Sequence, residues 1–373
     1  MFSRIATFSI NALSSVLKPD KILYRPLHFQ LEPTTYCNLR CPQCPRDSYV
    51  EEPRNMTLEE FAGVVDLMRP THITLSGLGE PTLNPELFDM ISYARKRRVN
   101  VNTTSNFVVL TDRHVRGFLR SDLNLLTVSV DAATPGSYLK VRGKDCFSAV
   151  IENVRILVGR KKEDRRGNPS LRLAFVVQKE NLEEISDFYR LAADLGVDAV
   201  LYQVFSDSAL DSKKRLISGM DIHGLESRMA EVMALEKKGG RPITNAGYLK
   251  RKISTIREIY SGRPINLVKG CIKPWVSAYI TVEGDVRPCC SFGAKRLNMG
   301  NVFETGDVGT IFNHRAYRDF REKIKRGKMP DAICSRCIPE SPMDILERSK
   351  WTPNFIASRR DRNRIKAPRP GVR

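Results

Sequence analysis

Three cysteines occur within eight residues, as Cys37, Cys41 and Cys44. Thiolates are soft ligands for iron–sulfur clusters and zinc, and a short loop can wrap three of them around one face of a cubane cluster, which leaves one iron open. A structural zinc site needs a fourth protein ligand, and no Cys or His lies between Cys44 and His72. An odd triplet also cannot pair internally as disulfides. The spacing therefore predicts a cluster-binding loop.

The elements that must position this loop form a regular alternation. Apolar runs rich in Val, Ile and Leu alternate six times with amphipathic stretches between residues 27 and 235. Such alternation predicts a parallel sheet with helical crossovers. Polar or glycine-containing segments follow the runs at 73–75, 99–102 and 125–130, where the carboxyl ends of parallel strands gather and ligands bind. We expect these segments to lie beside the cysteine loop.

The spacing of the three cysteines, with three and then two residues between them, resembles that of the radical SAM superfamily. The resemblance implies an α/β fold with a partial (β/α)6 barrel, and a 4Fe–4S cluster whose open iron binds S-adenosylmethionine. The segment Ser76-Gly77-Leu78-Gly79-Glu80-Pro81 is similar to the glycine-rich stretch after the family's second strand. The resemblance assigns these residues to the cofactor: Gly77, Gly79, Glu80, Pro81, Thr104, Ser105, Asn106, Ser129, Asp131 and Arg142.

Simpler interpretations of the same residues stay open. Gly-x-Gly-Glu-Pro is by itself the pattern of an ordinary turn. Ser, Thr and Asp at the end of a strand often do no more than cap it.

A second set of cysteines lies far along the chain. Between Cys271 and Cys289, residues 279–286 predict two strands joined by a Glu-Gly-Asp turn, and this hairpin would bring distant cysteines together. Cys334 and Cys337 add a tight pair. We expect Cys271, Cys289, Cys334 and Cys337 to be metal ligands, with Cys290 as the competing choice for the second position. A structural zinc would accept the same four thiolates. Cys146 stands alone and is expected to be an ordinary buried thiol.

The order of this second set resembles the auxiliary-cluster module of SPASM and twitch radical SAM enzymes. Gly284 and the segments 297–302 and 313–325 match pieces of that pattern. The two-cluster form continues with further cysteines, and none follows Cys337 in this sequence. The resemblance therefore implies the shorter twitch form, with a single auxiliary 4Fe–4S cluster.

These patterns divide the chain into five parts. We predict an N-terminal amphipathic helix or extension (1–26), a radical SAM core (27–235), a linker (236–268), a SPASM/twitch-like auxiliary cluster domain (269–340) and a basic, disordered tail (341–373). The N-terminal helix is expected to cap the barrel, and a role at a membrane surface is the alternative.

Charge and composition indicate the kind of partner. The chain carries a net charge of +19, and residues 348–373 contain nine Lys or Arg against one acid. A basic surface could attract an acidic electron donor such as flavodoxin or ferredoxin, and nucleic acid or an anionic membrane are the less favoured partners. No apolar run is long enough to span a bilayer, no secretory signal is present, and thiols at this density suggest a reducing cytoplasm.

The family resemblance also implies a reaction. Members cleave S-adenosylmethionine reductively to a 5′-deoxyadenosyl radical, which abstracts hydrogen from unactivated carbon. Here we expect a peptide or small polar metabolite as substrate, and an oxidoreductase reaction assisted by the auxiliary cluster. The alternatives are radical modification of RNA or a lipid, a redox-neutral epimerisation, and a non-catalytic iron–sulfur sensor. Tyr202, Gln203 and Asp207 are unranked proton-donor candidates, and no catalytic residue is assigned.

Overall fold

The computed structural model describes residues 4–164, 167–204, 220–261, 266–290 and 297–344. The predicted basic tail lies outside these residues apart from 341–344, and so does Asp207.

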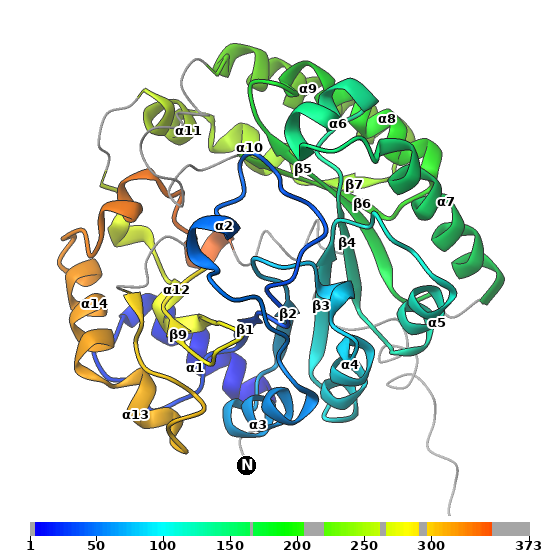
Figure 1. Cartoon of the computed structure of the whole chain (residues 1–373). Helices are drawn as coiled ribbons and strands as arrows, with labels where there is room; N and C mark the ends of the chain where they lie inside the picture. Colours follow the sequence, from blue (N-terminus) through cyan, green and yellow to red (C-terminus); the bar gives the residue numbers. More distant parts are fainter. Residues whose placement is uncertain (1–3, 165–166, 205–219, 262–265, 291–296, 345–373) are drawn as a thin grey trace, which may run out of the picture.

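One curved sheet forms the centre of the molecule (Figure 1). Its strands β1 to β6 are parallel and adjacent in chain order, as expected for a partial (β/α)6 barrel, so the predicted α/β fold class is confirmed. Their bounds are β1 His28–Leu31, β2 His72–Leu75, β3 Asn100–Ser105, β4 Leu125–Ser129, β5 Ser170–Val177 and β6 Ala199–Val204.

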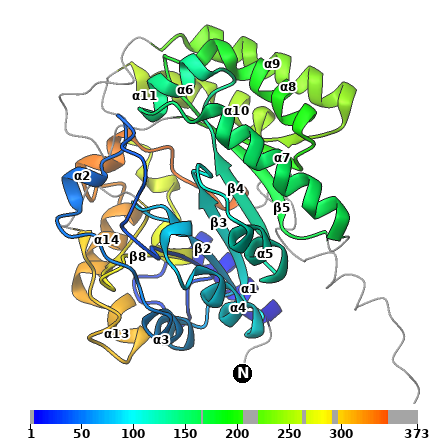
Figure 2. The same cartoon turned by 45° about the vertical axis from the view of Figure 1, so that its right-hand side comes forward.

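Helices cover the outer face of this sheet. Figures 1 and 2 show α4, α5, α7 and α8 as an outer layer around the strands. The helices of this half are α2 Arg46–Tyr49, α3 Leu58–Met68, α4 Leu87–Lys96, α5 Asp112–Arg120, α6 Pro135–Arg142, α7 Phe147–Asp164, α8 Ile185–Leu195 and α9 Ile222–Gly239, with the 3-10 helices η1 Pro81–Leu83 and η2 Leu182–Glu184.

The two faces of the first strands differ in polarity. Phe29, Leu31, Ile73 and Leu75 are fully buried toward the outer layer. The alternate residues, which pair across β1, β2 and β3 in register, are half-buried and polar, and they include His28, Gln30, Thr74, Asn102 and Thr104. The period of two places these side chains on the inner face, so the barrel presents a polar interior.

The C-terminal part extends the same sheet. Strand β8 (Ser277–Ile280) pairs in parallel with β1, and β9 (Val286–Arg287) pairs antiparallel with β8, which confirms the predicted hairpin. Gly284 forms its turn at φ 89°, and a Cβ there would lie 2.4 Å from the Phe303 ring. The remaining elements are η4 Val268–Gly270, α12 Lys273–Val276, α13 Val308–Phe312, α14 Arg315–Lys325 and η6 Ala332–Arg336.

Residues 236–268, which we expected to be a linker, contain regular structure. The short strand β7 (Ile243–Thr244) pairs with β6, and α10 (Ala246–Arg251) and α11 (Ile253–Tyr260) follow it. The sheet therefore has nine strands in the order β7-β6-β5-β4-β3-β2-β1-β8-β9. Strand β3 also runs three residues past the expected end at Asn102, because Thr103 and Thr104 are good strand formers.

The predicted N-terminal helix is present as α1 (Arg4–Leu17) and packs on α12. Its residues Leu13, Val16 and Leu17 are exposed, whereas Asn11, Ser14 and Ser15 are buried. The polar side faces inward because Asn11 Nδ2 donates to the carbonyl of Arg25 at 3.1 Å. Among the described residues, no helix is both long and apolar enough to cross a membrane.

Candidate functional site

The loop that carries Cys37, Cys41 and Cys44 leaves the carboxyl end of β1 and is closed at its base. The Thr35 amide donates to the carbonyl of Arg54 at 3.0 Å, and the Arg54 amide donates back to Thr35 Oγ1 at 2.9 Å. Within the loop, the Cys44 amide donates to the carbonyl of Cys41 at 3.0 Å. The short helix α2 follows at once. These bonds hold the three cysteines in one compact turn.

The glycine-rich segment after β2 packs directly on this loop. The Glu80 amide donates to the carbonyl of Tyr36 at 2.7 Å. A Cβ on Gly79 would lie 2.2 Å from the Thr34 carbonyl oxygen, which is a severe overlap. Gly79 is therefore required for this close approach, and Pro81 then begins η1.

Glu80 and Asn106 connect the next strand to the cysteine loop. The Glu80 side chain, which is 2% exposed, accepts the Asn106 amide at 2.6 Å and Thr82 Oγ1 at 2.8 Å. Asn106 Nδ2 lies 2.7 Å from Asn38 Oδ1 and 4.0 Å from Cys37 Sγ. Burial raises the pKa of Glu80, and the hydrogen bonds oppose that shift. Glu80 thus has protein partners for both carboxylate oxygens, and Asn106 reaches the cysteines.

A buried ion pair stands on the other side of the loop. Asp131 follows β4 with φ 63°, and its carboxylate lies 2.8 Å from Arg142 Nη2 and accepts the Val176 amide at 2.8 Å. Arg142 Nη1 lies 3.9 Å from Cys41 Sγ. Burial disfavours the charged guanidinium, but Asp131 and the Cys41 thiol raise the pKa of Arg142 overall. A fixed positive charge therefore faces the cysteine loop.

The cysteine loop suits a bound cationic cluster. Burial raises the pKa of Cys37 and raises that of Cys44 to about 11, and the neighbouring cysteines add to both shifts. Thiols with a raised pKa keep their protons at neutral pH. They become thiolate ligands when a bound metal supplies the positive charge that favours loss of the proton.

Two buried donors at the carboxyl ends of the strands also lack partners within the described part of the chain. They are Arg142 Nε and Nε2 of Gln178, which follows β5. A ligand that carries oxygen acceptors would satisfy both, because a buried donor without a partner is unfavourable. The side chains present therefore fit a cluster together with a polar cofactor that bears carboxylate or hydroxyl groups.

Of the remaining candidates, Thr104 lies on the inner face of β3, and Ser105 Oγ accepts the Phe107 amide at 3.0 Å. Ser129 is half-buried at the end of β4. Of the ten predicted cofactor residues, Gly79, Glu80, Asn106 and Arg142 contact the cysteine loop or the segment that leads into it, and the contacts of the described residues do not place Thr104, Ser105 or Ser129 against that loop.

The second cysteine set gathers beside the β8–β9 hairpin. Burial raises the pKa of Cys271 to about 12 and that of Cys334 to about 11, and Cys289 adds to both shifts. Burial also raises the pKa of Cys337, with Cys289 as its strongest neighbour among the thiols. The four predicted ligands thus lie within electrostatic reach of one another.

The surroundings favour Cys289 over Cys290 as the fourth member of this set. Cys289 is half-buried and raises the pKa of each of the other three predicted ligands. Cys290 is exposed, and among these three thiols it raises the pKa of Cys337 alone. None of the nine cysteines forms a disulfide, and Cys146 packs against the core. Within the described residues, no three Cys, His, Asp or Glu side chains are arranged to hold a single metal ion.

Sequence reasoning missed Glu32, which links the glycine-rich segment to the C-terminal hairpin. Its buried carboxylate accepts the Leu78 amide at 2.6 Å from the glycine-rich segment. It also accepts the Tyr279 hydroxyl at 3.1 Å and the Val282 amide at 3.4 Å from the C-terminal hairpin. Burial raises the pKa of Glu32. The only sequence signal is a carboxylate at the end of an apolar strand, five residues before Cys37.

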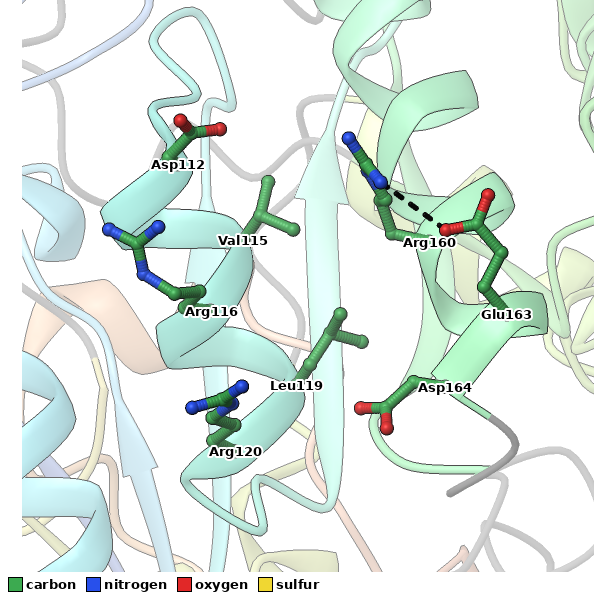
Figure 3. A pocket seen from close by; sticks show the side chains of 8 residues that line it. All are labelled: Asp112, Val115, Arg116, Leu119, Arg120, Arg160, Glu163 and Asp164. Atoms are coloured by element: carbon green, nitrogen blue, oxygen red, sulfur yellow. Dashed lines mark hydrogen bonds and ion pairs between the residues drawn. The ribbon is translucent and has the colours of Figure 1, made fainter.

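A surface hollow of about 520 Å³ lies elsewhere, between α5 and α7 (Figure 3). Asp112, Arg116, Arg160 and Glu163 line it, and Arg160 pairs with Glu163 at 3.4 Å. It lies in the outer helical layer and contains none of the predicted site residues, so we assign it no part in the chemistry.

Two family models match the chain. The radical SAM superfamily model matches residues 31–192, and a model described as an iron–sulfur cluster-binding domain, named SPASM, matches residues 271–338. The first range includes the loop of Cys37 to Cys44, and the second includes the other four predicted ligands.

Individual proteins show the same similarity. The tungsten-containing aldehyde ferredoxin oxidoreductase cofactor-modifying protein of Pyrococcus furiosus is 28% identical over 178 residues, which are 47% of this chain and 50% of that protein. The PqqA peptide cyclase of Streptomyces rochei is 24% identical over 309 residues, 81% of this chain and 80% of the cyclase. The match therefore spans half of the first relative and most of the second.

A solved structure has the same fold. SuiB of Streptococcus suis, bound to its precursor peptide SuiA, superposes with a TM-score of 0.66 and 16% identity, over 89% of this chain and 75% of SuiB.

Proposed function

Because the chain belongs to the radical SAM superfamily and carries the SPASM-type cluster-binding domain, we propose that it oxidises a peptide by removing hydrogen from a carbon atom. One observation carries this proposal. Strand β1 leads into the Cys37 loop, and its hydrogen-bonded neighbour β8 leads into the hairpin before Cys289. A single rigid sheet thus supports both cysteine sets.

The chain's own residues would bind and orient the cofactors. Cys37, Cys41 and Cys44 would hold the first cluster, and S-adenosylmethionine bound there supplies the hydrogen-abstracting chemistry. Arg142 Nε and Gln178 Nε2 would donate to the oxygens of that cofactor. Gly79 lets the glycine-rich backbone approach the start of the loop, and Gly77 leaves room for the Glu32 side chain.

The oxidation rests on the second cysteine set. Cys271, Cys289, Cys334 and Cys337 would complete the coordination of an auxiliary cluster. A fully ligated cluster offers no iron for substrate binding and suits electron transfer. A redox-neutral epimerisation is the alternative if this set instead holds zinc.

A peptide is the favoured substrate. The similar cyclase from Streptomyces rochei is named for a peptide, and the SuiB structure contains one. The polar inner face formed by His28, Gln30, Thr74 and Asn102 suits amide groups, although it also suits a small polar metabolite.

The release of 5′-deoxyadenosine tests whether the chain is an enzyme of this kind. Anaerobically reconstituted protein should form it from S-adenosylmethionine and dithionite, and a Cys41→Ser variant should not. A stable cluster that releases none would identify an iron–sulfur sensor and refute the proposal.

The substrate class is tested by adding a total extract of the source cells, which contains peptides, RNA and metabolites. If the substrate is a peptide, the extract should stimulate release of 5′-deoxyadenosine, and protease treatment of the extract should abolish that stimulation. Stimulation that survives protease but is lost after ribonuclease treatment would indicate RNA, and stimulation that survives both would indicate a metabolite.

A further inference from the structure

Helix α1 is oriented opposite to an ordinary surface helix. Leu13, Val16 and Leu17 are 59%, 67% and 64% exposed, whereas Asn11 and Ser15 are at most 3% exposed. A surface helix of a globular protein normally buries its apolar stripe and exposes its polar one. The apolar stripe of α1 therefore faces solvent and not the core of the protein.

Specific bonds hold α1 and the segment after it in this orientation. Asn11 Nδ2 donates to the Arg25 carbonyl, as described above. Trp275 Nε1 donates to the carbonyl of Pro19 at 2.9 Å, and the Ile22 amide donates to Asn313 Oδ1 at 2.9 Å. Rotation of α1 to bury Leu13 and Leu17 would break the hydrogen bond from Asn11 to the Arg25 carbonyl. This hydrogen bond therefore stabilises the outward orientation of the apolar stripe.

The segment after α1 exposes a further leucine. Leu23 is 95% exposed and stands in the sequence between the exposed cations Lys21 and Arg25. We call Leu13, Val16 and Leu17 the α1 face. A leucine that is this exposed is suited to insertion between the headgroups of a lipid bilayer.

The charges around the α1 face are mainly positive. Of the nearby acids, Asp20 pairs with Lys325 at 3.1 Å, and Asp307 caps α13 by accepting the amides of Gly309 and Thr310. Lys21 and Arg25 are exposed. The hydrogen bonds from Thr310 and, to a smaller extent, the nearby Arg25 lower the pKa of the Asp307 carboxyl group. The net charge of the chain is +19. Exposed leucines flanked by cations complement an anionic lipid surface.

We propose that the α1 face docks on an anionic membrane surface, in the plane of the headgroups. Helix α1 leads into β1, and the helix on which it packs, α12, leads into β8. Helix α1 therefore lies at the amino ends of β1 and β8 (Figures 1 and 2). The cysteine loop lies at the opposite, carboxyl ends. Docking through the α1 face therefore leaves the candidate site open to solvent. This inference does not depend on the proposed reaction.

Vesicle sedimentation tests the proposal with the full-length protein. The probes are vesicles of phosphatidylcholine alone and of phosphatidylcholine mixed with phosphatidylglycerol. The test variant is Leu13→Asp with Leu17→Asp, and the matched control is Ile156→Asp, because Ile156 is an exposed apolar residue on α7, away from this surface. Circular dichroism checks that each variant is folded.

The wild type and the Ile156→Asp control should sediment with the anionic vesicles and much less with the neutral ones, and added salt should release part of the protein. The Leu13/Leu17 variant should lose on the order of tenfold or more in its partition coefficient. Unchanged binding of that variant would overturn the proposal and point to the basic tail. Sedimentation velocity tests whether a second copy of the chain covers the α1 face instead. A wild type that is dimeric and does not bind vesicles, together with a Leu13/Leu17 variant that is monomeric, would overturn the membrane proposal in favour of that dimer.

Discussion

At the scale of single residues, the candidate site is built from buried polar groups that already have structural partners. Glu80 holds Asn106, and Asp131 holds Arg142 beside Cys41. These side chains therefore shape the site in the absence of any ligand. Their effect on folding can be measured separately from their effect on catalysis.

Replacement of Arg142 by Met should destabilise the protein strongly, because the Asp131 carboxylate would stay buried without its cation. We expect a loss of about 3–5 kcal/mol in the free energy of unfolding, measured by anaerobic urea denaturation of the apoprotein. The matched control is the exposed pair of Arg97 and Asp66, where Arg97→Met should change the free energy of unfolding far less, because water screens an exposed pair. Addition of Asp131→Asn to Arg142→Met should restore part of the loss. Equal effects of Arg142→Met and Arg97→Met would contradict this account of the buried pair.

Replacement of Gly79 by Ala should force the glycine-rich segment away from the cysteine loop. The new Cβ would overlap the Thr34 carbonyl, and we expect a cost of about 1–3 kcal/mol in unfolding free energy. Gly63→Ala is the control, since a Cβ there meets nothing within 4 Å and the helix should tolerate or prefer it. An unaffected Gly79→Ala variant would show that the segment approaches the loop less closely than described.

At the scale of secondary structure elements, the sequence predicts the parallel strands well but the surroundings of the sheet poorly. Apolar runs mark β4 and β5 because both faces of these strands are largely covered. The orientation of α1 was not predictable, because it depends on contacts such as that of Asn11 with Arg25, which only the tertiary fold creates. The pairing of β8 with β1 joins residues about 250 positions apart, and no local pattern encodes that pairing.

The same distinction applies to the site. The spacing of Cys37, Cys41 and Cys44 reveals a ligand set directly, since few other structures need that pattern. Glu32 and Gln178 carry no such spacing signal, and their importance follows from burial and unsatisfied or shared hydrogen bonds.

Helix α5 should make part of the stability dependent on pH. Thr111 and His114 form its capping box, in which His114 Nδ1 accepts the Thr111 amide at 3.2 Å and must therefore be unprotonated. Burial and then Arg113 lower the pKa of His114 in the folded state. The stability contributed by neutral His114 is present above the unfolded pKa of about 6.5 and is lost as the pH falls through the lower folded value.

We expect His114→Gln to retain the cap without this dependence, because Gln serves as well at the third position of a capping box. The test compares the unfolding free energies of wild type and variant at pH 8 and pH 5.5. Wild type should lose more unfolding free energy than the variant on acidification. Parallel pH profiles would show that His114 does not titrate in this range.

At the scale of the whole molecule, the two cysteine sets belong to one folded unit. Strand β8 of the C-terminal part pairs with β1, and Glu32 accepts hydrogen bonds from the glycine-rich segment and from the hairpin. A rigid connection of this kind would fix the separation between two metal centres.

The coupling through Glu32 can be measured by a double-mutant cycle. Tyr279→Phe removes a hydrogen bond to a buried carboxylate and should cost about 1.5–3 kcal/mol in unfolding free energy. The same change in a Glu32→Gln background should cost less, with an interaction energy of at least about 0.5 kcal/mol. Additive effects of the two substitutions would indicate that Glu32 does not join the two parts.

The most direct test of the central claim, that the chain holds two iron–sulfur clusters, is the metal content of a variant in which Cys37, Cys41 and Cys44 are all replaced by Ala. Iron, zinc and sulfide are determined after anaerobic reconstitution, together with electron paramagnetic resonance of the reduced protein. If the second cysteine set holds an auxiliary cluster, the variant should keep about four irons with matching sulfide and a reducible signal. A variant with no iron, or with one zinc in its place, would contradict the two-cluster account.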